Sequence, residues 1–185
     1  MTDLHALPAD LPAPVDDGAC AHLPGQRLPA APLPGTDGRS HDLSALPGRT
    51  VVYVYPKTGR PDGAMPDDWD QIPGARGCTP QSCAFRDHHA ELQAADARVF
   101  GLSVQPTPYQ QEAAERLHLP FPLLSDEEGT WSRALGLPTF EAGGETLLRR
   151  VTLILRDGVI EHVFYPVFPP DRNAADVLAW LAAHP

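Results

Sequence analysis

Two cysteines, Cys78 and Cys83, lie five positions apart in the segment 76-RGCTPQSCAFRD-87. Cys78 follows a glycine and precedes a pattern typical of a helix. We therefore expect its sulfur near the unpaired N–H groups and the positive dipole end of a helix start. That environment favours the thiolate, which is the nucleophilic form of cysteine, and the neighbouring Arg76 is expected to add to the effect. The segment predicts a reactive thiol at Cys78.

The spacing of the two thiols bears on how they react with each other. An intact helix from residue 78 onward would separate the two Cα atoms by roughly 8–9 Å and turn the side chains roughly 140° apart. A disulfide needs a Cα separation below about 7 Å. The thiols can join only if the first turn and a half unwinds, at a cost of a few hydrogen bonds of about 1 kcal/mol each. This spacing suits a thiolate that is oxidised to sulfenic acid and then condenses with a second thiol.

Strands and helices alternate around this segment. The apolar run 50-TVVYVYP-56 predicts a buried strand that ends at a proline, and the long loop 57–77 leads to a helix that begins near Thr79 with Pro80 in its first turn. The remaining elements are expected as strands at 98–104 and 121–126, helices at 108–119 and 127–137, a hairpin at 148–165, and a last helix at 171–184 with Asp171 as its cap. This order predicts an α/β fold whose sheet is covered on both faces.

The start of the chain has a different composition. The first 48 residues are rich in Pro, Gly and Asp, which predicts an extended arm and a hairpin. We expect residues 1–22 to form the arm and residues 23–185 to form one domain. A chain of 185 residues with 42% hydrophobic content is long enough for one substantial core.

Charge and hydropathy exclude several classes of protein. A net charge of −10 and 14 scattered Lys and Arg residues argue against a nucleic-acid partner. The N-terminus carries acids and prolines instead of a signal peptide pattern, and the longest apolar run is too short to cross a membrane. Three cysteines do not suit a secreted disulfide framework. We therefore expect a cytoplasmic protein with no membrane partner.

Two runs carry a resemblance to a known family. The segments 52-VYVYPKTG-59 and 77-GCTPQSCAFRD-87 resemble the active-site region of the peroxiredoxins, and more narrowly that of the Q-type, or bacterioferritin-comigratory, subfamily. The likeness continues through 147-LLRRVTLILRDGVIEHVF-164 and covers about residues 20–184. It implies a thioredoxin-like fold, with a central mixed sheet flanked by helices.

The resemblance also implies an activity. A thiol peroxidase of this type would use Cys78 as the peroxidatic cysteine and Cys83 as the resolving cysteine, with an intramolecular disulfide between them. Arg150 is the best match for the arginine that contacts the peroxidatic sulfur, and Arg149 is the alternative. The substrate would be hydrogen peroxide or an organic hydroperoxide, and the reductant thioredoxin or a glutaredoxin. No metal or organic cofactor is expected, and both a monomer and a dimer stay open.

The chain departs from the family pattern before the cysteine. The family usually carries a proline seven residues and a threonine three residues before the peroxidatic cysteine, and here those positions hold Gln71 and Ala75. Pro56 and Thr58 stand roughly twenty residues upstream of Cys78, so the loop between them looks like an insertion. We expect Thr58 to supply the hydroxyl that binds peroxide, with another group as the alternative.

Other interpretations of the cysteines compete with this one. The pair could be small core residues, since free cysteine is often buried. A zinc site would use Cys20, Cys78, Cys83 and His88 or His89, although zinc sites favour a spacing of two to four residues between paired cysteines. A Cys-His hydrolase would need a distant base such as His162. A redox sensor that uses the same disulfide without turnover is the main functional alternative.

Three further residues have open roles in the sequence. Cys20 is expected to be a bystander in the arm. Arg150 would by default be an outward strand residue in a surface ion pair, if the resemblance were set aside. Trp69, in the long loop, is either a lid over a pocket or the centre of the loop's own small core.

Overall fold

The computed structural model describes residues 3–185, and its centre is a five-stranded sheet in the order β5-β4-β3-β8-β9. Strand β3 (Arg49–Val54) runs parallel to β4 (Ala97–Ser103), which runs parallel to β5 (Leu123–Ser125). On its other side β3 pairs antiparallel with β8 (Val151–Arg156), and β8 pairs antiparallel with β9 (Val159–Phe164). The sheet is mixed, and the predicted α/β, thioredoxin-like class is confirmed.

Strand β3 forms the middle of the sheet because its side chains are β-branched or aromatic at five of six positions and all six are buried. Val51 pairs with Val99 on one side and with Ile154 on the other, so β3 is hydrogen-bonded along both edges. The strand ends where Pro56 interrupts the ladder. Its carboxyl end therefore has a fixed position from which the functional segments start.

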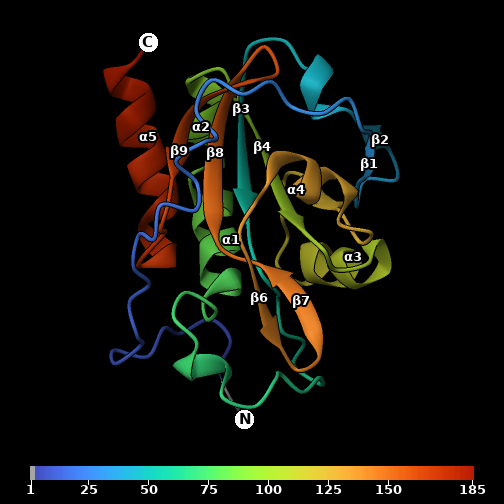
Figure 1. Cartoon of the computed structure of the whole chain (residues 1–185), viewed down its shortest axis with the longest axis vertical. Helices are drawn as coiled ribbons and strands as arrows, with labels where there is room; N and C mark the ends of the chain where they lie inside the picture. The colour runs from blue at the N-terminus through green and yellow to red at the C-terminus, as the bar shows by residue number, and fades with distance from the viewer. Residues whose placement is uncertain (1–2) are drawn as a thin grey trace.

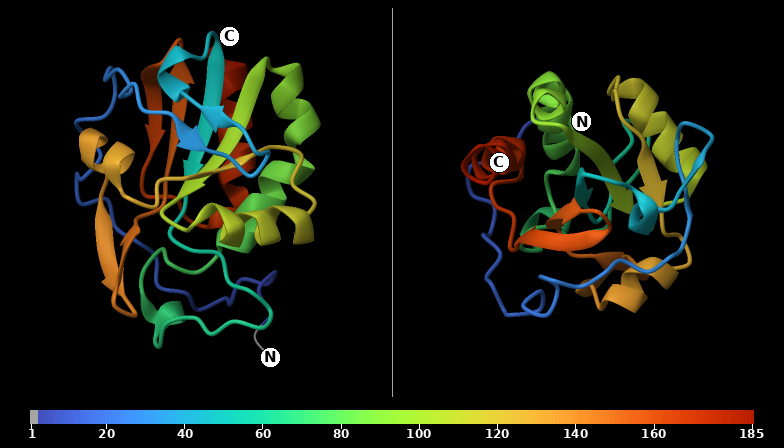
Figure 2. Two further views of the ribbon diagram at one scale, coloured as in Figure 1. Left: turned by 90° about the vertical axis from the view of Figure 1, so that its right-hand side faces the viewer. Right: turned by 90° about the horizontal axis from the view of Figure 1, so that it is seen from above.

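Helices cover one face of the sheet. Figure 2 shows α5 (Asn173–Ala183) beside α1 (Cys78–Asp87) and α2 (His89–Ala94) on that face. The core between these helices and the sheet contains Tyr53, Phe85, Leu92 and Val177, all fully buried. Phe85 stacks on Tyr53 with ring centroids 4.6 Å apart, which fixes α1 over the central strand.

The opposite face is covered more by extended chain than by helices. Residues 20–46, with strands β1 (Leu33–Pro34) and β2 (Ser40–His41), cross this face and bury Cys20, Leu23 and Leu28 against the sheet. Helix α4 (Thr130–Leu135) adds Trp131 to the same core, and α3 (Thr107–Arg116) lies beside β5. Both faces of the sheet are covered, as predicted. The hairpin expected within the first 48 residues is the pair β1–β2.

Several local predictions were wrong. The hairpin of β6 (Thr139–Ala142) and β7 (Glu145–Leu148) was not predicted, because its strands are short and only three of their eight residues are buried. The helix after Cys78 is interrupted at His88. The last helix begins at Asn173 after a 3₁₀ turn at Pro170–Arg172, and no side chain caps it, so Asp171 is not its cap. Pro169 and Pro170 stand at the start of this turn, where their missing N–H groups are tolerated.

Three segments gather at the carboxyl end of β3. Figure 1 shows the arm, the loop between β3 and α1, and the β6–β7 hairpin together at this end. The loop contains a 3₁₀ turn, η2 (Trp69–Gln71), and Trp69 packs with Ala75, Ala142 and Leu147 in a small separate core. Trp69 is therefore part of a core that the loop shares with the hairpin. Within residues 3–185, no helix is long and apolar enough to cross a membrane.

Candidate active site

Helix α1 begins at Cys78 because Gly77 gives the chain the turn it needs there. Gly77 has φ 112°, a left-handed conformation that other residues rarely adopt. A Cβ at this position would lie 2.3 Å from Cγ of Pro170 and 3.0 Å from Cδ2 of Leu7. The glycine therefore allows close packing as well as the turn. Cys78 is 2% exposed, with its sulfur at the helix start as the sequence predicts.

Arg150 lies against the Cys78 sulfur. Its Nη2 is 3.3 Å from Cys78 Sγ and donates to the carbonyl oxygen of Ala75 at 3.0 Å, with the carbonyl oxygens of Gly74 and Arg76 at 3.3 Å each. Arg150 is 4% exposed, and no carboxylate forms an ion pair with it among residues 3–185. A buried cation needs a counter-charge, and a thiolate at Cys78 is the group in contact that can supply it.

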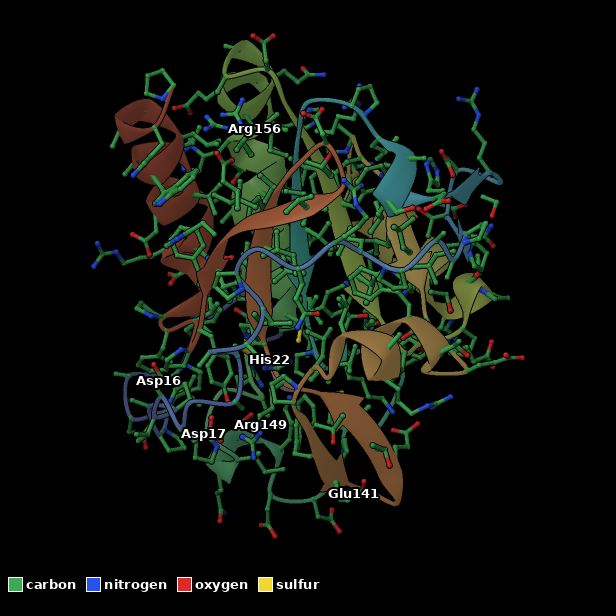
Figure 3. All side chains as sticks on the ribbon, turned by 45° about the horizontal axis from the view of Figure 1, so that its top comes forward. Asp16, Asp17, His22, Glu141, Arg149 and Arg156 are labelled. Atoms are coloured by element: carbon green, nitrogen blue, oxygen red, sulfur yellow. The ribbon has the colours of Figure 1, made fainter. Side chains whose placement is uncertain are left out.

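Arg149 lies elsewhere. Its guanidinium sits over the ring of Phe140, with the Cζ atom 5.8 Å from the ring centroid. Figure 3 shows Arg149 near Asp17 of the arm, and its positive charge helps to lower the pKa of that carboxyl, after the larger effect of a hydrogen bond from Tyr165. Of the two arginines that the sequence offered, the structure brings Arg150 and not Arg149 to the sulfur.

Buried side chains hold Arg150 from behind. Its Nη1 donates to Oε1 of Gln81, and Nε2 of Gln81 donates to Oδ1 of Asn173 at 3.0 Å. The hydroxyl of Thr152 donates to the same oxygen at 2.7 Å. Sequence reasoning missed Gln81 and Asn173, because they are 92 positions apart and neither belongs to a recognisable motif.

Cys83 lies on the same helix as Cys78, half-buried and unbonded. With α1 intact, five helical residues place the two Cα atoms roughly 8–9 Å apart, which is too far for a disulfide. Burial raises the pKa of the Cys83 thiol, although the nearby Arg86 opposes this. Cys83 is therefore held as the neutral thiol while α1 is folded.

Cys20 belongs to a different environment. It is buried in the core under the extended segment, and burial together with Asp17 and Asp16 raises its pKa to about 12. A thiol in such a site stays protonated and inert at neutral pH.

Thr58 makes its hydrogen bonds with Gln105 and Tyr109. Its hydroxyl donates to Oε1 of Gln105 at 3.1 Å, its backbone N–H donates to the same atom at 3.0 Å, and its carbonyl accepts from the Tyr109 hydroxyl at 2.9 Å. Gln105 and Tyr109 line a cavity of about 670 Å³ between α3, α4 and the β6–β7 hairpin, and neither Cys78 nor Arg150 lines it. In the described part of the chain no hydrogen bond joins Thr58 to Cys78.

Tyr55 is a second hydroxyl near the site, and its position in an apolar run predicts only a place in a buried strand. The Tyr55 side chain is fully buried, and its hydroxyl has no hydrogen-bond partner of good geometry within residues 3–185. Burial raises the pKa of Tyr55, the nearby Ser103 hydroxyl lowers it by less, and negative charge on Cys78 raises it further. The phenol therefore stays protonated and can donate a hydrogen bond.

Arg76 ties the loop to the arm. Its guanidinium is buried, forms an ion pair with Asp70 at 3.2 Å, and donates to the carbonyl oxygens of Asp3 and Ala6. The expected support of Arg76 for the thiolate is thus weakened by the carboxylate of Asp70. The arm is held directly beside the residues that precede Cys78.

The competing sites find no geometric support. In the part of the chain that the structure describes, no group of three His, Cys, Asp or Glu side chains is placed to hold a metal ion. His162 packs its ring against Phe164 and Trp180, with centroids 4.7 and 4.8 Å away, and burial lowers its pKa. His89 lies against Phe121, with ring centroids 5.7 Å apart. These histidines have packing roles.

Comparisons with known proteins agree with the geometry. The family model described as Redoxin matches residues 23–178. Peroxiredoxin Q, chloroplastic, of Oryza sativa subsp. japonica is 34% identical over 156 residues, which cover 83% of this chain. The chain spans 64% of the length of that relative.

Solved structures give the same result. Peroxidoxin BcpB from Mycobacterium tuberculosis is 28% identical with a TM-score of 0.72, and the match covers 89% of this chain and 99% of that one. The bacterioferritin comigratory protein of Xanthomonas campestris, whose structure concerns alkyl peroxide reduction, is 26% identical with a TM-score of 0.68. This match covers 85% of this chain and 96% of that one. The chain therefore belongs to the redoxin family, and within it to the Q-type peroxiredoxins.

Proposed function

We propose that the protein is a thiol peroxidase that reduces hydrogen peroxide and organic hydroperoxides by a two-cysteine mechanism. The observation that carries the proposal is the 3.3 Å contact between the buried Arg150 guanidinium and the sulfur of Cys78 at the start of α1. A cation and a helix start at one sulfur favour the thiolate, and a buried thiolate beside an arginine is suited to attack a neutral, polarisable oxygen.

In the first step the Cys78 thiolate attacks one oxygen of the peroxide and the O–O bond breaks. The sulfur loses two electrons and becomes sulfenic acid, while the departing hydroxide or alkoxide takes up a proton and leaves as water or alcohol. Arg150 stabilises the negative charge that moves to the departing oxygen. Its donors are fixed before the peroxide arrives, which is the arrangement that lowers a barrier most effectively.

In the second step Cys83 attacks the sulfenic sulfur as a thiolate. An S–S bond forms, the S–O bond breaks, and the oxygen leaves as water. Because α1 keeps the sulfurs apart, this step requires the start of the helix to unwind. Unwinding also moves Cys83 out of the environment that raises its pKa, and so makes it a better nucleophile.

The cycle closes when an external dithiol reduces the disulfide by thiol exchange. We infer that thioredoxin or a glutaredoxin supplies it, in a reducing compartment that we expect to be the cytoplasm. Alkyl hydroperoxides are included as substrates because alkyl peroxide reduction is the activity ascribed to the similar protein of Xanthomonas campestris.

The roles of the cysteines are tested by substitution. Cys78→Ser is expected to abolish peroxide consumption, since no other thiol is positioned by Arg150. Cys83→Ser is expected to consume one equivalent and stop at sulfenic acid, detected by mass after trapping. Cys20→Ser is expected to leave turnover unchanged, because this buried thiol stays protonated. The measurement is peroxide loss with thioredoxin, thioredoxin reductase and NADPH.

Equal and mild losses in the Cys78 and Cys83 variants would contradict the assignment of roles. One stoichiometric oxidation of the unaltered protein, with no further turnover for any dithiol reductant, would favour a redox sensor over an enzyme.

A further inference from the structure

A chain of buried hydrogen bonds runs from β8 and the first residue of α5 to the arginine at the reactive sulfur. Thr152 and Gln81 both donate to the Asn173 side-chain oxygen, and Gln81 accepts from Arg150. Gln81 and Thr152 are fully buried, and Asn173 is 2% exposed. We call Thr152, Asn173 and Gln81 the relay.

The chemistry of Arg150 fixes the direction of every bond in the relay. A guanidinium can only donate, so Gln81 must turn its oxygen toward Arg150 and its NH₂ group away from it. The NH₂ group then needs an acceptor, and the Asn173 oxygen is placed to serve. The Thr152 hydroxyl donates to that same oxygen and holds the amide of Asn173 in this orientation. No member of the relay carries a charge, so Arg150 keeps its full charge for the sulfur.

The relay also crosses the segment that must unwind. Gln81 lies three residues after Cys78 and two before Cys83, inside the turn and a half of α1 that separates the thiols. When this segment unwinds, Gln81 moves away from α5 and from Arg150, and the bonds to both are lost. A buried amide that loses its partners makes unwinding costly.

We propose that Asn173 is a positioning residue that acts through Gln81 in both steps of the reaction. In the first step it holds the guanidinium on the Cys78 sulfur. In the second it restrains the unwinding of α1, and so delays disulfide formation. The assignment rests on the proposed function, and its signature is that loss of the Asn173 amide slows peroxide attack and accelerates disulfide formation.

The substitution Asn173→Ala tests both effects. Attack is measured in a Cys83→Ser background as the rate of Cys78 oxidation by hydrogen peroxide. Disulfide formation is measured in the chain with both cysteines, by quenching and mass analysis after one equivalent of peroxide. Both effects depend on the loss of one buried hydrogen bond, that between Gln81 and Asn173. We therefore expect peroxide attack to be severalfold slower and disulfide formation to be about tenfold faster.

Three matched variants separate the relay from general destabilisation. Asn173→Asp keeps an oxygen acceptor, so disulfide formation is expected within about twofold of the parent rate. Thr152→Val keeps the shape of the side chain but removes its donor, and is expected to change both rates in the same directions as Asn173→Ala by smaller factors. Arg172→Ala, next to Asn173, removes a side chain that is 71% exposed and forms a long, 3.9 Å ion pair with Asp176. This substitution is expected to change neither rate.

Two measurements without peroxide keep this test separate from the test of the peroxidase. Amide exchange at residues 79–83 of the reduced protein reports the opening of α1 and should be about tenfold faster in Asn173→Ala. Ultraviolet absorbance reports the thiolate fraction of Cys78 in a Cys20→Ser, Cys83→Ser background, and this fraction should fall at a given pH.

Opposite changes in the two steps, or in the two peroxide-free measures, support the relay. A fall in both rates in proportion to lost thermal stability would overturn it, as would unchanged values in a folded Asn173→Ala protein. A parent protein that fails to react with peroxide would reject the proposed function, while exchange and absorbance would still decide the relay.

Discussion

At the scale of single residues, the site is organised around a cation that has no carboxylate partner among residues 3–185. Arg150 contacts backbone carbonyls, the neutral Gln81 and the Cys78 sulfur, all in a buried space. Backbone carbonyls are already in place before any substrate enters, so the guanidinium has little freedom to reorient. A fixed donor of this kind is suited to stabilise charge that develops on a departing oxygen.

Two hydroxyls, those of Thr58 and Tyr55, are the candidates to bind the peroxide. Ala75 stands where the family usually has a threonine, and a carbon side chain donates no hydrogen bond. We expect Thr58→Val to slow Cys78 oxidation by roughly tenfold if Thr58 exchanges its bond with Gln105 for one with the peroxide. Tyr55→Phe serves as the comparison, because within residues 3–185 that buried hydroxyl has no hydrogen-bond partner of good geometry. Stopped-flow measurement of Cys78 oxidation ranks the two.

A rate that falls only in Tyr55→Phe would remove Thr58 from the site and assign the donor to the phenol. Unchanged rates in both variants would leave Arg150 and backbone N–H groups as the donors. Thermal unfolding of each variant is the control, because Thr58→Val also removes the hydroxyl bond to Gln105 and keeps only the backbone bonds between these residues.

Only part of the site was predictable from residue types. Cys78 and Cys83 follow from spacing and from the physics of a helix start, which are local properties. Arg150 could be selected over Arg149 only through the family resemblance, because both lie before a strand and their contacts depend on tertiary packing. Asn173 could not be found at all, since its role depends on a contact with Gln81 that no local pattern encodes.

At the scale of elements, α1 has two incompatible tasks. As a helix it places Cys78 at its first position, and as an unwound segment it lets Cys78 reach Cys83. We expect the oxidised protein to show much faster amide exchange across residues 78–86 than the reduced protein, because a disulfide between these positions cannot form across intact turns. Exchange is measured by mass on protein whose Cys78–Cys83 bond is established by peptide mapping.

Unchanged protection across residues 78–86 in such oxidised protein would overturn the requirement for unwinding. Helix α2 provides an internal control, because the interruption at His88 separates it from α1 and the whole helix lies after the segment between the two cysteines. Its exchange is expected to change little.

The elements themselves were largely predictable, for physical reasons. β3, β4 and β8 are long, β-rich runs whose burial on both faces leaves a clear signal in composition. The β6–β7 hairpin was missed because its stability comes from packing with Trp69 of the loop, which the sequence of the hairpin does not reveal. Helix α4 is shorter than predicted, because Gly129 and Gly136 stand at its two ends in left-handed conformations.

At the scale of the whole molecule, parts that are distant in sequence meet beside Arg150, the residue in contact with the Cys78 sulfur. The arm contributes Pro14 and Val15 to a cavity of about 20 Å³ whose walls also include Gly74, Arg150 and Tyr165. Such a volume holds little more than one water-sized molecule. The Tyr165 hydroxyl donates to Asp17 at 2.9 Å and so anchors the arm at this point. The arm therefore narrows the space in front of Arg150.

This enclosure leads to a prediction about substrate size. Removing residues 1–17 opens the cavity beside Arg150 and also deprives Arg76 of two carbonyl acceptors. We expect the truncated protein to react severalfold faster with a bulky aryl hydroperoxide relative to hydrogen peroxide, because Pro14 and Val15 crowd the space beside Arg150 and their removal helps a large substrate more than a small one. The ratio of the two second-order rates of Cys78 oxidation is the measurement, since any general loss of thiolate or of stability cancels in it. Tyr165→Phe, which releases only the anchor to Asp17, should change the ratio in the same direction by a smaller factor. A ratio equal to that of the full chain in a folded, active truncation would show that the arm stabilises the loop without selecting the substrate.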